Sequence, residues 1–350
     1  MSDSSEAGQP GKVAVLDRET VLFQEDRMSL KMRVGLGQFQ ELTDEMLLFI
    51  KQMGADDFLM NTPRLPKETG QWEYEDLKEL KDKADSADLR LMALENVPLE
   101  FYTDIMLAGP NRDKQIEHMA NTIRNMGKAG IPILGYHWLP NKVWRTEPLA
   151  TLRGGAKATR FDQSEHDPDE LTHGRVYTKE EITENFDYYL ERILPVAEEA
   201  DVVLALHPDD PPVDSLGGVG RIFGTFDEFK RGIDKFDSPH HKLDFCMGCW
   251  SEMSAEGAVP AISHFAKRDR IAYVHLRFVQ GEVPCFNECF IDEGSVDPFE
   301  AVKALKEAGF TGFLITDHVP KTEGDTPWGH RGRAYALGYI KCLIDYTDRL

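Results

Sequence analysis

Eight short apolar segments run through the chain, and each is followed by a helical pattern or by a loop and then a helical pattern. They span residues 32–36, 56–61, 89–97, 131–139, 202–207, 241–248, 271–278 and 312–318. Strands that alternate with helices predict a parallel sheet, and eight repeats match the (β/α)8 TIM barrel in number and order. The rival is a doubly wound open sheet. A Rossmann sheet of that kind would need a Gly-x-Gly-x-x-Gly turn after an early strand, and none is found there.

The predicted barrel takes up residues 31–350 as one domain with long loops between strands and helices. Residues 140–178 form the longest loop and read as irregular, and a loop of this length inside a compact domain usually serves as a lid or a binding loop. Residues 208–224 form a second long loop. Residues 1–30 begin with a polar stretch rich in small residues, so we expect a flexible tail and a short lead-in there.

The formal net charge is −21, from 61 acidic and 40 basic residues. Such a field repels nucleic-acid phosphates and an anionic membrane surface, so we expect neither partner. An anionic small molecule remains compatible with this charge, because a bound metal ion and local arginines can reverse the potential inside one pocket. A homo-oligomer, as a dimer or a tetramer, is left open.

The five cysteines bear on the cellular compartment of the protein. No signal peptide precedes them, so we interpret them as reduced thiols of a cytoplasmic protein. Cys246 and Cys249 have the spacing of a zinc or redox CxxC site, but no partner pair follows at zinc-ribbon spacing. Cys285 and Cys289 are expected in a loop, and their role stays open.

Metal-binding residue types stand at four successive predicted strand ends. The fifth strand ends at His207, the sixth at Cys246, the seventh carries His275, and the eighth ends at Asp317. The carboxyl ends of barrel strands meet at one face, where barrel enzymes carry their active sites. Imidazole, thiolate and carboxylate together bind divalent transition metals, with Mn²⁺, Fe²⁺ and Zn²⁺ all compatible. Taken singly, each residue would be an ordinary structural one.

His318 directly follows Asp317 and is the candidate general base. Its unperturbed pKa is near ~6.5, so an imidazole can accept a proton near neutral pH. The alternative is a loop histidine that is hydrogen-bonded to the backbone.

With these residues assembled, the chain resembles the mannonate dehydratases from about Met32 to the C-terminal helix. The motifs that carry the resemblance are LENVP at 94–98, ATRFD at 158–162, LHPDDPP at 206–212, FCMG at 245–248, VHLR at 274–277, GSVD at 294–297 and DH at 317–318. The resemblance implies dehydration of D-mannonate to 2-dehydro-3-deoxy-D-gluconate, a step of hexuronate and glucuronate catabolism. It implies Mn²⁺, or else Fe²⁺, on His207, Cys246, His275 and Asp317, with His318 as the catalytic histidine.

Seven further residues are candidates for contacts with a sugar acid: Arg160, His137, Tyr136, Asp209, Asp210, Arg277 and Glu288. The planar fork of Arg160 suits anionic oxygens, although a surface ion pair is the alternative. His137 and Tyr136 end the fourth strand and are expected to face the pocket. Asp209 and Asp210 either bind hydroxyls or hold His207 through a hydrogen bond.

The sequence departs from the family pattern at three places. Thr316 and its predecessor stand where the family often has an arginine, and Phe290 marks a loop where a histidine is expected. The proton donor to the leaving group is not placed; Tyr335 and Tyr339 on the last helix are candidates, and Tyr335 is preferred. These departures leave the exact sugar acid open.

The sequence thus predicts a metal-dependent lyase acting on a sugar acid, most simply D-mannonate. The alternatives are a sugar isomerase or epimerase on the same barrel, a dehydratase of another sugar acid, a barrel that binds without catalysis, and a structural zinc protein.

Overall fold

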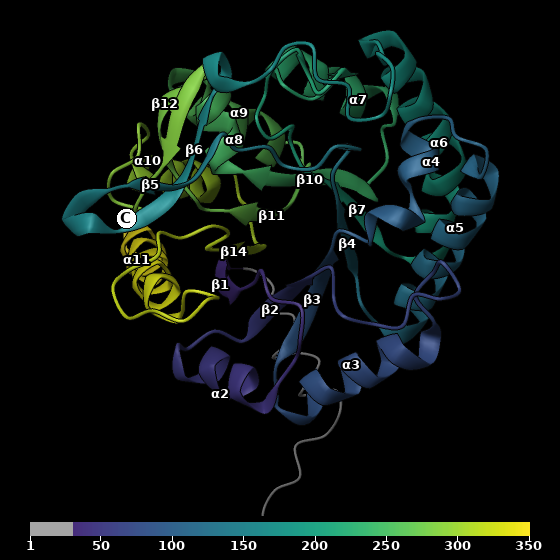
Figure 1. Cartoon of the computed structure of the whole chain (residues 1–350). Coiled ribbons are helices and arrows are strands. Elements are labelled where there is room, and N and C mark those ends of the chain that lie inside the picture. Colours follow the sequence, from purple (N-terminus) through teal and green to yellow (C-terminus); the bar gives the residue numbers. More distant parts are fainter. Residues whose placement is uncertain (1–30) are drawn as a thin grey trace, which may run out of the picture. The chain divides into compact units, whose positions relative to one another are not determined.

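A closed barrel of eight parallel strands dominates the computed structural model, which describes residues 31–350 (Figure 1). The strands are β1 (Arg33–Leu36), β2 (Asp57–Asn61), β3 (Arg90–Glu95), β4 (Ile133–Tyr136), β7 (Val203–Leu206), β10 (His241–Cys246), β11 (Ile271–His275) and β14 (Phe313–Ile315). Strands that follow one another in the chain are neighbours in the barrel, and β14 closes on β1. The predicted (β/α)8 barrel is therefore confirmed. The tail predicted for residues 1–30 lies outside the described residues.

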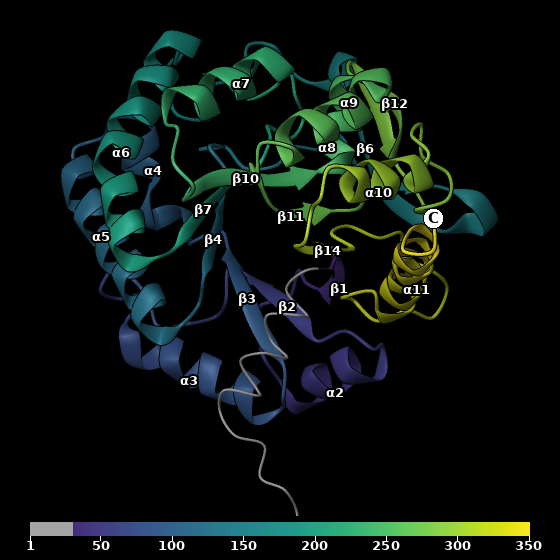
Figure 2. The same cartoon turned by 180° about the vertical axis from the view of Figure 1, so that it is seen from behind.

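Helices surround the barrel, as the two opposite views show (Figures 1 and 2). They are α2 (Asp44–Gln52), α3 (Tyr74–Ser86), α4 (Thr103–Met106), α5 (Arg112–Ala129), α6 (Lys179–Ala200), α7 (Phe226–Lys235), α8 (Met247–Met253), α9 (Ala255–Ala266), α10 (Pro298–Glu307) and α11 (His330–Thr347). Local sequence explains where they begin. In α6, for example, Thr178 and Glu181 form a capping box that satisfies free backbone N–H groups. Among the described residues, none of the helices combines the length and the apolar composition that crossing a lipid bilayer requires.

A second sheet changes the prediction for the long loop after β4. Residues 140–178 were expected to be irregular, but they contain β5 (Glu147–Thr151) and β6 (Lys157–Asp162). These strands form an antiparallel sheet with β12 (Val279–Glu282) and β13 (Cys285–Glu288), in the order β12-β13-β6-β5. The pairing joins segments more than a hundred residues apart, which local periodicity does not reveal. It also places Cys285 in a strand instead of the expected loop.

The end of the sixth predicted strand also differs. Residues 241–248 were expected to be one strand, but β10 stops at Cys246 and α8 begins at Met247. Cys246 is thus the residue that precedes the helix, at the point where the chain leaves the barrel.

The barrel interior is filled by apolar side chains from alternate strand positions: Leu59, Ala93, Ile133, Ala205, Tyr273, Phe313 and Ile315. Gly135 on β4 leaves room for one of them. A Cβ atom on this glycine would lie 2.1 Å from Oη of Tyr273 and 3.0 Å from Cγ of Glu95. The Tyr273 hydroxyl uses that space to reach Oε2 of Glu95 at 3.3 Å.

We expect Gly135→Ala to lower the free energy of unfolding by about 1–3 kcal/mol, because the methyl group displaces a fully buried tyrosine. Urea unfolding measures the change. Gly338→Ala is the matched control, since Gly338 is an exposed position of α11 with nothing within 4 Å of the added Cβ. It should stabilise by about 0.4–1 kcal/mol. Equal effects of the two substitutions would contradict this packing.

Candidate metal centre and active site

Three of the predicted ligands meet at the carboxyl ends of neighbouring strands. His207 follows β7, Cys246 ends β10 and His275 ends β11. One donor atom from each of the three side chains lies within 4.8 Å of the other two. The parallel register sets Cys246 opposite His275, so the barrel itself produces the cluster.

The ring of His275 is held so that one nitrogen remains free. Its Nε2 lies 2.8 Å from Oε2 of Glu95, to which it donates a hydrogen bond, and 3.4 Å from Oδ2 of Asp244. Among the described residues, no hydrogen-bond partner is found for its buried Nδ1, which lies 3.6 Å from Oδ2 of Asp317. A buried nitrogen without a partner costs free energy. Metal-binding histidines characteristically donate their other N–H to a carboxylate, so this arrangement fits a metal ligand.

His207 is oriented in a similar way by the backbone. Its Nδ1 lies 2.8 Å from the carbonyl oxygen of Pro208, which leaves Nε2 for the cluster. The ring centroids of His207 and His275 are 5.5 Å apart. The carbonyl of Pro208 thus performs the orienting role that the sequence had offered to Asp209 or Asp210.

The third ligand is poised as a thiolate. Burial raises the pKa of the Cys246 thiol, but a hydrogen bond with Cys249 and the charge of Arg277 outweigh burial and hold this pKa well below its ordinary value. Thiolate is the form in which cysteine binds a metal ion. Two imidazoles, one thiolate and the neighbouring carboxylate of Asp317 therefore form a donor set that a divalent transition metal accepts.

His318 stands next to this cluster in a defined orientation. Its Nδ1 lies 2.7 Å from Oε1 of Glu288, and its Nε2 lies 3.7 Å from Oδ1 of Asp317. The side chain is 41% exposed, so a small molecule can reach it. Burial lowers the pKa of His318, but the charges of Asp317 and Glu288 outweigh burial and raise it to about 9.

Two buried arginines compensate the acidic groups below His318. Arg277 donates hydrogen bonds to four carboxylates. Its Nε reaches Asp317 at 3.1 Å, and its Nη2 reaches Asp210 at 2.9 Å. Its Nη1 reaches both Glu252 at 2.9 Å and Glu288 at 3.2 Å. Arg145 binds Asp210 through both terminal nitrogens and Glu288 at 2.9 Å. Burial raises the pKa of Glu288, but His318 and Arg145 outweigh it and hold this pKa well below its ordinary value.

Three residues predicted to contact the substrate, Arg277, Asp210 and Glu288, belong to this network. Nη2 of Arg277 also donates to Sγ of Cys249 at 3.1 Å, so each of its nitrogens already has an acceptor. Asp210 is bound by both arginines. Glu288 holds His318. Each of these three side chains is at least nine-tenths buried and is bonded within this network.

Asp209 and Tyr136 also lie elsewhere than expected. Asp209 is buried, and its Oδ2 accepts a hydrogen bond of 2.6 Å from the backbone N–H of Phe223. Tyr136 does not face the pocket: it packs in the core between barrel and helices, with its hydroxyl 3.2 Å from Nε2 of His241. The reason is the alternation of side chains along a strand, since Gly135 takes the inward position on β4.

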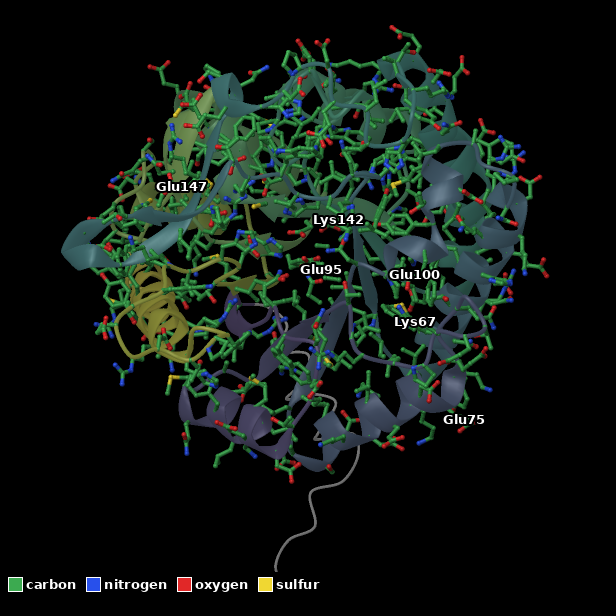
Figure 3. The ribbon with its side chains drawn as sticks, in the orientation of Figure 1. Lys67, Glu75, Glu95, Glu100, Lys142 and Glu147 are labelled. Atoms are coloured by element: carbon green, nitrogen blue, oxygen red, sulfur yellow. The ribbon has the colours of Figure 1, made fainter. Side chains whose placement is uncertain are left out.

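His137 does face open space. It lines a cavity of about 1040 Å³ over the ends of β2, β3 and β4, together with Asn61 and Lys142. We call this space the β2–β4 cavity. Asn61 donates to Oε1 of Glu95 at 3.0 Å, and Glu95 contacts His275, so the cavity lies near the candidate ligands His207, Cys246 and His275, called the metal cluster below. Figure 3 shows Glu95 within the ring of strands.

Arg160 and Tyr335 lie further out. Arg160 on β6 is bound to Asp162 at 2.6 Å and Glu165 at 2.9 Å, which matches the surface ion pair that was its alternative. Tyr335 on α11 is 44% exposed, and it lines a small cavity together with His318, Phe290 and Thr316. Tyr339 is not among the residues that line this cavity.

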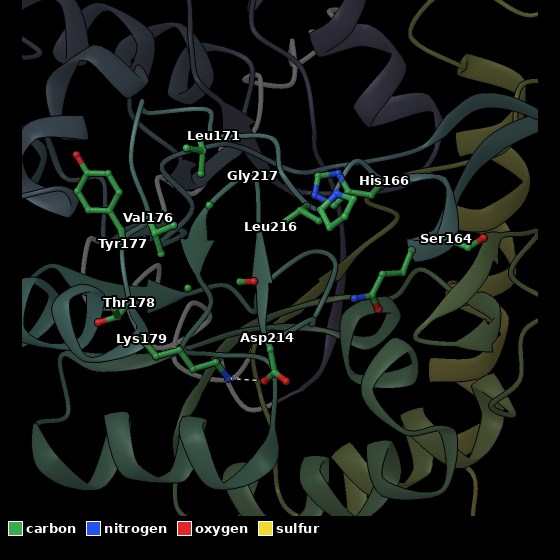
Figure 4. A pocket seen from close by; sticks show the side chains of 15 residues that line it. Ser164, His166, Leu171, Val176, Tyr177, Thr178, Lys179, Asp214, Leu216 and Gly217 are labelled. Atoms are coloured by element: carbon green, nitrogen blue, oxygen red, sulfur yellow. Dashed lines mark hydrogen bonds and ion pairs between the residues drawn. The ribbon is translucent and has the colours of Figure 1, made fainter.

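A separate hollow of about 780 Å³ lies between the two long loops, and Figure 4 shows its lining. Lys179 binds Asp214 there at 2.7 Å. None of the residues predicted for the active site lines this hollow.

Sequence reasoning missed three residues that the structure brings to the site. Glu95 lies in the LENVP segment, and its position at the end of β3 was the available signal. Arg145 lies in the long loop, and Glu252 lies on α8. Neither carries a local signal, because only the folded chain brings them to Arg277 and Glu288.

We expect Glu95→Gln to weaken metal binding by about 10- to 100-fold, since the substitution loosens the carboxylate that fixes His275. Calorimetric titration of metal-free protein with Mn²⁺ measures the change. Glu100→Gln is the control, because Glu100 is exposed and pairs only with Lys67 among the described residues. Unchanged affinity in Glu95→Gln would contradict the assignment of His275 as a ligand.

Comparisons with known proteins identify the family of this chain. The family model described as D-mannonate dehydratase (UxuA) matches residues 32–176 and 169–350. The mannonate dehydratase of Thermotoga maritima is 32% identical over 322 residues, covering 80% of this chain and 87% of that protein. That of Streptococcus agalactiae serotype V is 29% identical over 289 residues, covering 75% and 81%.

Solved structures give the same result. The crystal structure of mannonate dehydratase from Streptococcus suis serotype 2 has a TM-score of 0.82 at 28% identity, covering 91% of this chain and 95% of that chain. An L-ribulose 3-epimerase has a TM-score of 0.59 at 14% identity, covering 91% of this chain and 96% of that chain, which shows a shared barrel alone. The resemblance found in the sequence is confirmed, and the chain belongs to the D-mannonate dehydratase family.

Proposed function

We propose that this chain dehydrates D-mannonate to 2-dehydro-3-deoxy-D-gluconate and water, with a divalent metal ion bound by His207, Cys246, His275 and Asp317. The observation that carries the proposal is the free, buried Nδ1 of His275 facing two further donors, beside an accessible histidine. Family membership supplies the substrate. A bound divalent cation would neutralise Asp317 and stabilise negative charge on the substrate carboxylate as a Lewis acid.

His318 is the base in this proposal. The reaction removes the proton from C2 of the acid, next to the carboxylate, and expels the hydroxyl group of C3. Glu288 accepts the hydrogen bond from Nδ1 of His318, so Nε2 is the nitrogen left to face C2. Because the charges of Asp317 and Glu288 raise the pKa of His318, Nε2 would present a lone pair once a bound cation offsets the charge of Asp317. A fixed tautomer and a fixed ring direction place the base before the substrate arrives.

Loss of hydroxide requires a proton donor, because hydroxide is a poor leaving group. Tyr335 remains the candidate, since it lines the same small cavity as His318. Its exposure distinguishes it from Tyr102, Tyr136 and Tyr273, which are buried in the core.

The finer assignments belong to the same proposal. We favour Mn²⁺, with Fe²⁺ as the alternative, because a set with one thiolate and three harder donors accepts both. A place in hexuronate breakdown, a cytoplasmic location and a dimer or tetramer are kept as predictions. An epimerase on the same barrel is the competing function, since it would use the same metal and base without expelling water.

The first test uses the metal-loaded protein with D-mannonate and detects the 2-keto-3-deoxy acid. We expect product with the wild-type chain, and His318→Asn should lower kcat by about 10²- to 10⁴-fold while leaving metal affinity unchanged. His240→Asn is the control, because His240 pairs with Asp201 at the opposite end of β10. Epimerised sugar without water loss would overturn the dehydratase assignment.

A second test concerns Glu288. Glu288→Gln lets the side-chain amide stabilise the wrong tautomer of His318, so kcat should fall between about 10-fold and 10⁴-fold with KM nearly unchanged. Glu147→Gln on exposed β5 is the control. A large rise in KM with unchanged kcat would instead make Glu288 a substrate contact, as first expected from the sequence.

A further inference from the structure

One of the cations that line the β2–β4 cavity is bound to no acceptor among the described residues. Three basic side chains line the cavity: Arg64, Lys67 and Lys142. Arg64 pairs with Glu41, and Lys67 pairs with Glu100. The exposed ammonium group of Lys142 forms no hydrogen bond or ion pair within residues 31–350, although its charge, after the hydrogen bond from Lys67, helps to lower the pKa of the Glu100 carboxyl. Figure 3 labels Lys142, Lys67 and Glu100.

The backbone of Lys142 is held in an unfavourable conformation. Its φ is +63°, in the left-handed region that a glycine would occupy without strain. The turn is fixed from two sides: the Lys142 N–H donates to the carbonyl of Leu139 at 3.1 Å, and Nη2 of Arg221 donates to the Lys142 carbonyl at 3.4 Å. A strained residue with a long side chain at a cavity is a reason to look for a function.

The cavity is placed to receive the far end of a substrate. Its inner wall includes His137 and Asn61, and Asn61 contacts Glu95, which holds His275. A six-carbon acid whose C1 and C2 lie at the metal cluster and His318 extends its remaining hydroxyl groups away from them. A cavity of about 1040 Å³ accommodates a chain of that size.

We infer that Lys142 is a specificity-determining residue that binds the distal hydroxyl groups, on C5 and C6, of the sugar acid in the β2–β4 cavity. This inference rests on the proposed function, because it takes the carboxylate end of the substrate to lie at the metal cluster. An ammonium group has three donors and no acceptor, which suits a pair of hydroxyl oxygens. Hydroxyls fit better than a second carboxylate, since Glu68 and Glu100 also line the cavity.

The test combines a substitution with a shortened substrate. In the metal-loaded enzyme, Lys142→Met should raise KM for D-mannonate about 10-fold or more, with kcat changed by less than about threefold, because the lost contact is present in both ground and transition states. A four-carbon aldonate with the same configuration at C2 and C3 lacks the distal hydroxyls. Its KM should be the same for the wild type and for Lys142→Met.

Two controls separate the ammonium group from the strained turn and from general charge. Lys142→Gly removes the strain together with the amine, and it should bind D-mannonate as weakly as Lys142→Met. Lys78→Met removes an exposed cation of α3 that lies outside the cavity and pairs with Asp82, and it should change KM by less than about twofold.

Product detection with the wild type, together with calorimetric titration of the slow His318→Asn protein with D-mannonate, distinguishes a failure of the proposed function from a failure of the inference about Lys142. If the wild type produces no 2-keto-3-deoxy acid, the proposed function fails. If it does, but Lys142→Met leaves KM for D-mannonate unchanged, or weakens the four-carbon and six-carbon acids equally, the inference about Lys142 fails alone. Loss of calorimetric binding on introducing Lys142→Met supports it.

Discussion

The buried guanidinium of Arg277 is the interaction on which the active site depends. A buried charge costs several kcal/mol unless it is paired and hydrogen-bonded, so Arg277 must keep its carboxylate partners. These partners come from four different parts of the chain: Asp210, Glu252, Glu288 and Asp317. The same electrostatic requirement that keeps the interior stable therefore holds Asp317, the proposed fourth metal ligand, and Glu288, the partner of His318, in place.

Glu95 performs a comparable role on the other side of the metal cluster. It accepts hydrogen bonds from His275, Gln38 and Asn61, and the hydroxyl of Tyr273 also reaches it. Burial raises the pKa of Glu95, but His275 outweighs burial and lowers it to about 2. An ionised carboxylate at this position orients one imidazole nitrogen and leaves the other for a metal ion. The layer of side chains inside the barrel thus supports the chemistry above it.

The antiparallel sheet β12-β13-β6-β5 links the barrel to its long loops. Glu288 lies on β13, and the pairing of β13 with β6 joins the loop after β4 to the loop after β11. Arg145 precedes β5 and reaches Glu288 from that loop. Two segments that look like separate irregular loops therefore build one wall of the site. Their long-range pairing explains how His318, at the end of one barrel strand, receives Glu288 from a second sheet.

The sequence by itself determined the barrel and its metal-type donors. Periodicity within each segment identifies strands and helices, and parallel strands must bring His207, Cys246 and His275 to one face. Only the tertiary structure decided that Tyr136 points into the core and that Glu288 forms a hydrogen bond with His318. It also decided which partners Glu95, Arg145 and Glu252 contact. The physical reason is that hydrogen bonds between buried charges depend on distances between segments remote in the chain. Local sequence carries residue type and periodicity, but it does not carry those distances.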